Sequence, residues 1–267
     1  MRIYSIKELE PIISEIQENL GRTGRVDYTE YYRGQSQNSY KLENGIGRLK
    51  YRKCVIKRRE RKLFNKYISN VGAKKIDFIQ DPYNSDQYKY SKEWFYLYQA
   101  QHIGIKTRLL DWTMRWDIAL LFAVNEVIHF GKDGQFWVFI CPRKYIINAS
   151  NLGTIYNTHP LKIAESYMIN SPFYQDTEGK DNIAERRRAR QQGRFFIQSF
   201  EKAIIPLEEQ PELQPFLTKY IIDGSSKARI IEELGNITEE WANYRHDDNI
   251  STEVYKLNNI LSKNCLF

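Results

Sequence analysis

"IKTRLLDWTMRWDIALLFAV", residues 105–124, places a short extended segment directly before a strongly apolar one. Residues 106–110 predict a strand, and residues 111–113 predict a turn after it. The run IALLFAV is apolar on nearly all sides, so we expect a central, buried helix whose N-cap is Asp111 or Thr113.

Other segments alternate between helical and extended patterns. Ser5 and Glu8 have the S-x-x-E spacing of a capping box, and apolar residues recur at helical spacing from Leu9 to Leu20. Further helices are predicted over residues 49–68, 92–101 and 227–234, and strands over residues 28–32, 135–141, 194–200 and 219–223.

The order of these segments predicts an α+β fold. We find no internal repeat and no low-complexity linker, so we expect a single domain with a central mixed or antiparallel sheet of short strands flanked by helices. Residues 1–27 are expected to form an N-terminal helix and lead-in, 28–235 the domain itself, and 236–267 a C-terminal helical tail packed on it.

Composition narrows the class of protein. Among 267 residues, 42% are apolar and 14% aromatic, which argues against disorder. The net charge of +7 favours an anionic partner, such as nucleic acid, nucleotide phosphate or an acidic protein. Three scattered cysteines suggest neither a disulfide framework nor a zinc site. With no signal-peptide pattern and no apolar run of membrane-spanning length, we expect a cytoplasmic protein without a membrane partner.

The most basic segment covers residues 49–68, with nine lysines and arginines against the single Glu60. Its apolar residues can share one helical face, which leaves most of the cations on the opposite side. This pattern fits either the solvated face of a core helix or an electrostatic footprint for nucleic acid. A second basic cluster lies at 186–194.

The densest group of chemically useful side chains is "QHIGIKTRLLDWT", residues 101–113. It holds His102, Arg108 and Asp111, which offer a proton donor or acceptor, a phosphate clamp and an orienting carboxylate. A structural ion pair between Arg108 and Asp111, with His102 in the core, is the alternative. The sequence lacks the spacing of a metal site, GxSxG, a P-loop, GxGxxG and a nuclease-like cluster of carboxylates.

Three motifs occur in a characteristic order: "YYRGQ" at 31–35, "HIGIKTRLLDWT" at 102–113 and "RARQQGRFFI" at 188–197. Together they resemble the FRG domain family, named for its Phe/Tyr-Arg-Gly motif, over roughly residues 30–235. Such domains occur in bacteria and phages, often in settings of defence or toxin function. The resemblance therefore implies a role in bacterial or phage conflict.

The order of motifs is also similar to that of Arg-Ser-Glu type ADP-ribosyltransferases, which implies NAD as a cofactor and a macromolecular target. This similarity implies that Arg33 grips the NAD phosphates or ribose, that Tyr32 or Trp112 stacks on nicotinamide, and that Gln191 takes the place of a catalytic glutamate. With the chemistry of residues 101–113, we expect cofactor binding by Tyr32, Arg33, Gly34, Gln35, Arg108 and Trp112, and catalysis by His102, Asp111 and Gln191. Gln191 and Gly193 fill the family's Glu-x-Glu position without a carboxylate, so Glu185 or Asp111 would have to supply one. The alternative is a non-enzymatic module that binds nucleic acid or protein through its basic surface.

Overall fold

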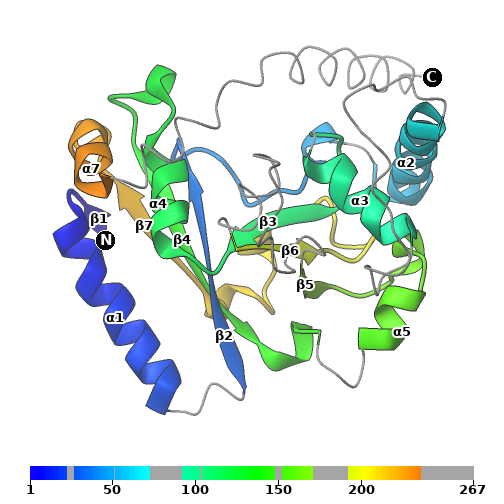
Figure 1. The fold of residues 1–267 in the computed structure, drawn as a ribbon, viewed down its shortest axis with the longest axis horizontal. Coiled ribbons are helices and arrows are strands. Elements are labelled where there is room, and N and C mark those ends of the chain that lie inside the picture. The colour runs from blue at the N-terminus through cyan, green and yellow to red at the C-terminus, as the bar shows by residue number, and fades with distance from the viewer. Residues whose placement is uncertain are drawn as a thin grey trace, which may run out of the picture.

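The computed structural model describes seven stretches of the chain, residues 1–22, 27–50, 52–72, 92–102, 104–147, 152–170 and 192–235. They form one α+β domain, a seven-stranded mixed sheet flanked by six helices (Figure 1). The predicted α+β single domain is confirmed. The predicted tail at 236–267 lies outside the described residues.

The elements follow the chain in an alternating order. The helices are α1 (Ile6–Arg22), α2 (Ile56–Gly72), α3 (Lys92–His102), α4 (Trp116–Val124), α5 (Leu152–Asn157) and α7 (Lys227–Leu234). The strands are β1 (Arg2–Ile3), β2 (Tyr28–Gln35), β3 (Leu109–Thr113), β4 (Gly134–Pro142), β5 (Tyr167–Asn170), β6 (Gly193–Ile197) and β7 (Leu217–Ile222).

The strand order is β1-β7-β4-β2-β3-β6-β5. β1 pairs with β7 in parallel, and the other pairings among the described strands are antiparallel. β2 and β4 pair along the whole length of β2, from Tyr28 with Pro142 to Gln35 with Gln135. This long central pair fixes the position of the residues at the end of β2.

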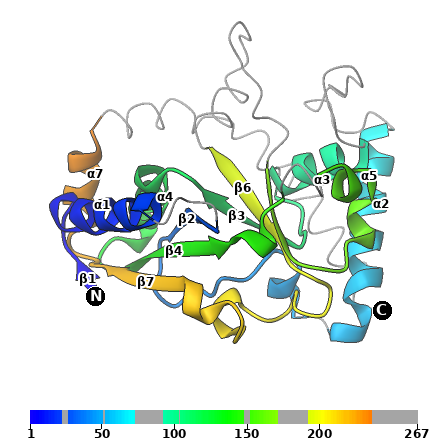
Figure 2. The ribbon, with the colours of Figure 1, turned by 90° about the horizontal axis from the view of Figure 1, so that it is seen from below.

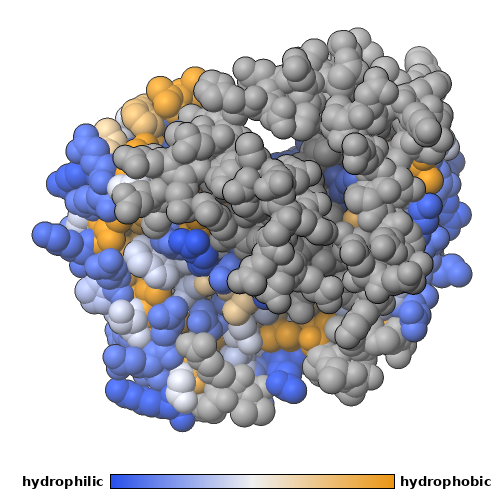
Figure 3. All heavy atoms as spheres, viewed as in Figure 1, coloured by the Kyte–Doolittle hydropathy of each residue, from blue (hydrophilic) through white to orange (hydrophobic). Residues whose placement is uncertain are grey.

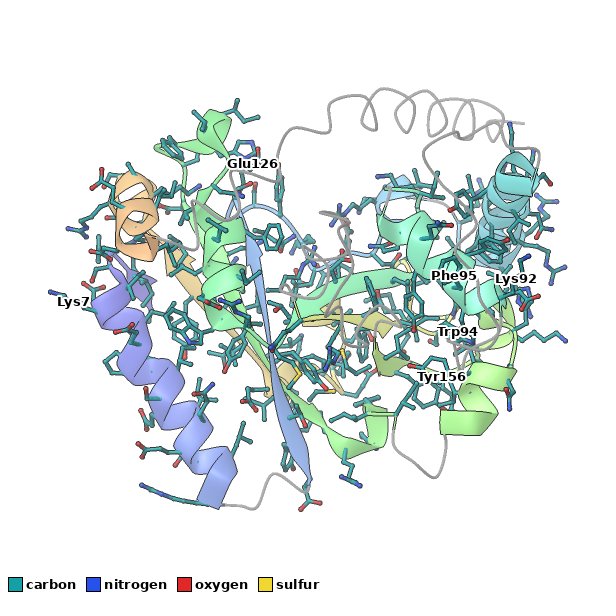
Figure 4. All side chains as sticks on the ribbon, viewed as in Figure 1. Lys7, Lys92, Trp94, Phe95, Glu126 and Tyr156 are labelled. Atoms are coloured by element: carbon teal, nitrogen blue, oxygen red, sulfur yellow. The ribbon has the colours of Figure 1, made fainter. Side chains whose placement is uncertain are left out.

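Two clusters of apolar side chains lie side by side on one face of the sheet. α1, α4 and α7 pack over β2, β4 and β7, while α2, α3 and α5 pack over β3, β5 and β6. Figure 2 shows α1 and α4 on the same side of the sheet. In the cluster over β3, β5 and β6, Trp94 of α3 lies against Tyr156 of α5, with ring centroids 5.4 Å apart (Figure 4). The opposite face is covered by Leu42 and by the short 3-10 segments that precede β7.

α4 approaches β2 and β4 unusually closely, and two glycines make this possible. A Cβ atom built on Gly34 would lie 1.7 Å from the backbone oxygen of Ala119, and one on Gly134 would lie 2.7 Å from that of Ala123. Both alanines are fully buried. The glycines of the strands and the alanines of α4 therefore form one close contact between backbones.

Three expectations about local structure need correction. β2 does not end at Arg33 but continues to Gln35, because pairing with β4 holds it extended. Residues 111–113 are not a turn, since they pair with β6 as part of β3. The N-cap of α4 is Arg115, and neither Asp111 nor Thr113 takes that position. The strands β1 and β5 were not anticipated.

No helix within the described stretches is long and apolar enough to span a membrane.

Candidate functional site

β2 and β3 are neighbours in the sheet but separate immediately beyond their junction. Within these two described strands the pairing consists of Tyr32 with Thr113, whereas β3 pairs with β6 along its whole length. Figure 1 shows β3 running away from β2 at a wide angle. The separation leaves a wedge between Arg33 on β2 and Asp111 on β3.

Arg33 fills this wedge. Its Nη1 donates to the backbone oxygen of Asp111 and lies 3.7 Å from Oδ2 of the same residue. The Arg33 side chain is 14% exposed, and burial lowers its pKa to about 10, against the opposing effect of the Asp111 carboxylate. Its Nε is buried and has no hydrogen-bond partner among the described residues. Arg33 is thus a largely desolvated cation with an unused donor.

Asp111 is held in place by a chain of hydrogen bonds. Nε2 of Gln101, on α3, donates to Oδ1 at 3.1 Å and to Oδ2 at 3.0 Å. Oε1 of Gln101 in turn accepts from the hydroxyl of Thr107 at 2.6 Å. The Asp111 side chain remains 54% exposed. An oriented and accessible carboxylate therefore lies beside the Arg33 guanidinium.

Two further cations lie beside this network. The loop at 45–48 packs on the segment before β3, where the backbone nitrogen of Ile46 donates to the oxygen of Thr107 at 3.0 Å. Arg48 is exposed and lies close enough to lower the pKa of Arg33. The pKa of Lys106 is lowered by burial and by Arg48. We call Arg33, Arg48, Gln101, Lys106, Thr107 and Asp111 the wedge cluster.

Two tryptophans lie beside Arg33 on the same face of the sheet, the one opposite to α4. Trp137 is its partner on β4, and Trp112 lies beside Asp111 on β3. Their side chains are 6% and 3% exposed, and neither indole Nε1 has a hydrogen-bond partner among the described residues. Three buried N–H donors without a protein acceptor thus lie on adjacent strands, an arrangement that calls for an explanation.

The second arginine predicted to bind phosphate, Arg108, lies deep in the core with 1% of its side chain exposed. Its Nε donates to Oε2 of Glu60 at 2.7 Å, and its backbone nitrogen donates to Oε1 at 3.0 Å. Nη1 and Nη2 donate to backbone oxygens at 2.7–3.2 Å, those of Pro160, Ile163 and Gln198. Each guanidinium nitrogen has a protein acceptor, and this geometry does not favour a phosphate contact. The alternative pairing of Arg108 with Asp111 is wrong, because each has a different partner.

The other predicted cofactor residues on β2 contribute to packing. Tyr32 is fully buried and packs on Phe136 with ring centroids 5.9 Å apart. Gly34 lies under α4, as described above. The Gln35 amide donates to the backbone oxygen of Lys41 at 3.3 Å and accepts from Gln135 at 2.8 Å. Of the predicted site residues, the structure brings Arg33 and Asp111 into contact and leaves the roles of the others as predictions.

His102 is the last residue of α3, and its side chain lies outside the described residues. Gln191 lies wholly outside them. The predicted catalytic roles of both stay predictions.

Sequence reasoning missed Arg48, Gln101, Lys106 and Thr107 as site residues. Three of them, Gln101, Lys106 and Thr107, lie in the same 101–113 stretch, where attention went to His102, Arg108 and Asp111 instead. Arg48 was not named as a site residue, because only the packing of its loop on residue 107 brings it close to Arg33.

No cluster of three or more potential metal-binding His, Cys, Asp or Glu side chains occurs in the part of the chain that the structure describes.

The fold and the wedge cluster define an α+β protein with a cationic site at a junction of strands. Residues 29–132 match the family model of the FRG domain, so the chain contains an FRG domain. The matched range includes the whole wedge cluster. No curated protein and no solved structure matches the chain.

Proposed function

We propose that the wedge cluster binds a phosphate-bearing nucleotide, with NAD as the first candidate, and that the protein transfers ADP-ribose to a macromolecular target. The observation that carries this proposal is an excess of positive charge: Arg48 lies near both Arg33 and Lys106, while Arg33 contacts the one carboxylate of the cluster, Asp111. As the family resemblance implies, the setting would be conflict between bacteria and phages.

The charges of the cluster favour an anionic ligand. Burial, and in second place the positive charge of Arg48, disfavour the charged forms of Arg33 and Lys106, as their lowered pKa values reflect. A phosphate beside Arg48 would offset its repulsion of both groups and accept hydrogen bonds from the guanidinium groups. The unused Nε of Arg33 is a donor available for such a contact if the side chain shifts on binding.

Asp111 is the residue we assign to the chemistry. In the proposed reaction the bond between ribose C1′ and the nicotinamide nitrogen breaks, and its electron pair leaves with nicotinamide. A nucleophile of the target forms the new bond to C1′ and releases its proton to solvent. An oriented carboxylate at the wedge would stabilise the positive charge that develops on the ribose. This assignment would supply the carboxylate that Gln191 and Gly193 do not offer.

Calorimetric titration with NAD, ADP-ribose and inorganic phosphate tests the binding site. We expect NAD to bind the wild-type protein and Arg48→Gln to bind it about 10-fold more weakly, because a charge-assisted hydrogen bond is lost. Lys7→Gln, an exposed lysine on α1, is the matched control and should bind like wild type. Absence of NAD binding by the wild type, or equal binding by Arg48→Gln, contradicts the proposal.

Asp111→Asn tests the chemistry separately. We expect nicotinamide release from NAD to fall by about 100-fold, since the carboxylate charge is lost while its shape remains. NAD affinity, measured by the same titration, should change by only a few-fold. If Asp111→Asn releases nicotinamide at the wild-type rate, Asp111 has no catalytic role.

A further inference from the structure

The outer face of α2 carries a dense array of cations. Its exposed residues include Lys57, Arg58, Arg61 and Lys62, and Lys53 precedes them in a 3-10 turn. Figure 3 shows hydrophilic side chains along this edge of the molecule, where Figure 1 places α2. His159 packs on Phe64 of α2 with ring centroids 6.0 Å apart, and burial lowers its pKa. Glu93 raises this pKa, while the exposed Lys162 and Arg61 lower it, so Lys162 and one carboxylate, Glu93, lie beside the array. We call these six cations the α2 cationic surface.

The cations form rows at helical spacing. Lys53, Lys57 and Arg61 follow one another at intervals of four residues, as do Arg58 and Lys62. Within α2, Lys57 and Arg61 are therefore separated by about 6 Å along the helix axis, and so are Arg58 and Lys62. Like charges at this spacing repel each other and destabilise an isolated helix.

The one carboxylate of this segment is withdrawn from the surface. Glu60 is 2% exposed and binds Arg108 in the core. The apolar residues of α2 face inward too, where Leu63, Phe64 and Tyr67 are buried. The outer face thus has neither a compensating anion of its own helix nor the apolar stripe with which an amphipathic helix enters a membrane.

We infer that the α2 cationic surface binds the phosphate backbone of nucleic acid. A regular row of cations fits a partner whose negative charges repeat at regular intervals, and such a partner would relieve the repulsion along the helix. The surface shares no residue with the wedge cluster. Variants of one surface therefore leave the residues of the other unchanged.

Fluorescence anisotropy with labelled double-stranded DNA, single-stranded DNA and RNA tests the inference over a range of salt concentrations. The test variant is Lys57→Gln/Arg61→Gln, which removes two cations from one row. The control is Lys7→Gln/Arg22→Gln on α1, which removes the same charge at the opposite end of the domain, where Figure 4 labels Lys7. A protein that merely has a positive net charge would respond equally to both variants.

For wild type we expect binding that weakens steeply with salt. The row variant should bind double-stranded DNA at least about 10-fold more weakly, and its salt slope should fall by about 1.8, because two phosphate contacts are lost. The α1 control should stay within about two-fold of wild type. Arg58→Gln/Lys62→Gln removes the other row and should behave like the first row variant.

Four outcomes would overturn the inference. These are no binding at low salt, equal weakening by the α1 control, full binding by both row variants, and equally strong competition by polyglutamate or by phosphatidylserine vesicles. The last result would assign the surface to an acidic protein or to a membrane. Thermal unfolding of each variant accompanies the measurement and shows that weaker binding is not a loss of folding.

Discussion

Replacing Gly34 with alanine is expected to destabilise the domain by about 3 kcal/mol or more, the upper range for overpacking a core. The new Cβ would lie 1.7 Å from the backbone oxygen of Ala119, and a backbone atom cannot turn aside as a flexible side chain can. α4 would have to move away from β2 and carry its buried apolar side chains with it. Chemical denaturation followed by circular dichroism measures the change.

Gly21→Ala and Gly193→Ala are the matched controls, because a Cβ atom at either position meets nothing within 4 Å. Both should change the free energy of unfolding by no more than about 1 kcal/mol. If Gly34→Ala unfolds at the same denaturant concentration as wild type, the close approach of α4 is not required for stability.

The Arg-Gly pair of YYRGQ thus has two different functions in the structure. Gly34 permits the contact between β2 and α4, which is a requirement of packing. Arg33 fills the wedge between β2 and β3 and donates to a carbonyl of the neighbouring strand. Neighbouring residues in a strand point to opposite faces of the sheet. Gly34 can therefore contact α4 while Arg33 contacts β3.

Elements with strong local signals were predicted well. The apolar spacing of α1, the buried run of β4 and the α7 helix that ends before Gly235 are all present near their expected bounds. The prediction failed where the conformation of a segment depends on pairing with a strand that is distant in the sequence. Residues 111–113 have turn-like composition, yet β6 holds them extended. β1 has two residues and exists because β7 offers a partner.

The candidate site could be predicted only in part for the same reason: its contacts join residues that are far apart in the sequence. Arg33 and Asp111 could be named as site candidates because each lies in a distinctive motif, but they are 78 residues apart in sequence, so their contact was invisible. Arg108 and Glu60 are 48 residues apart in the sequence. No sequence pattern predicts that an arginine just before β3 pairs with the one carboxylate of a basic helix. Residue type indicated that Arg33 and Arg108 could bind phosphate. Tertiary packing determined that Arg108 binds Glu60 in the core and that Arg33 keeps an unused donor.

Glu60→Gln is expected to destabilise the domain by about 3–5 kcal/mol, because it leaves the buried Arg108 guanidinium without a compensating charge. The amide of glutamine also places a donor where both carboxylate oxygens now accept from Arg108. The penalty should appear as a lower denaturation midpoint. Glu18→Gln removes a carboxylate from an exposed pair with Arg22 and should change stability by less than about 1 kcal/mol.

The double variant Glu60→Leu/Arg108→Leu separates the ion pair from its surroundings. Leucine at position 108 leaves backbone oxygens without a donor, so each single leucine variant and the double variant should be less stable than wild type. The double variant should nevertheless lose less than the sum of the two single variants, by about 1–3 kcal/mol, because it leaves no isolated charge in the core. Strict additivity would mean that Glu60 and Arg108 are not coupled, and α2 would then be held to β3 by its apolar face alone.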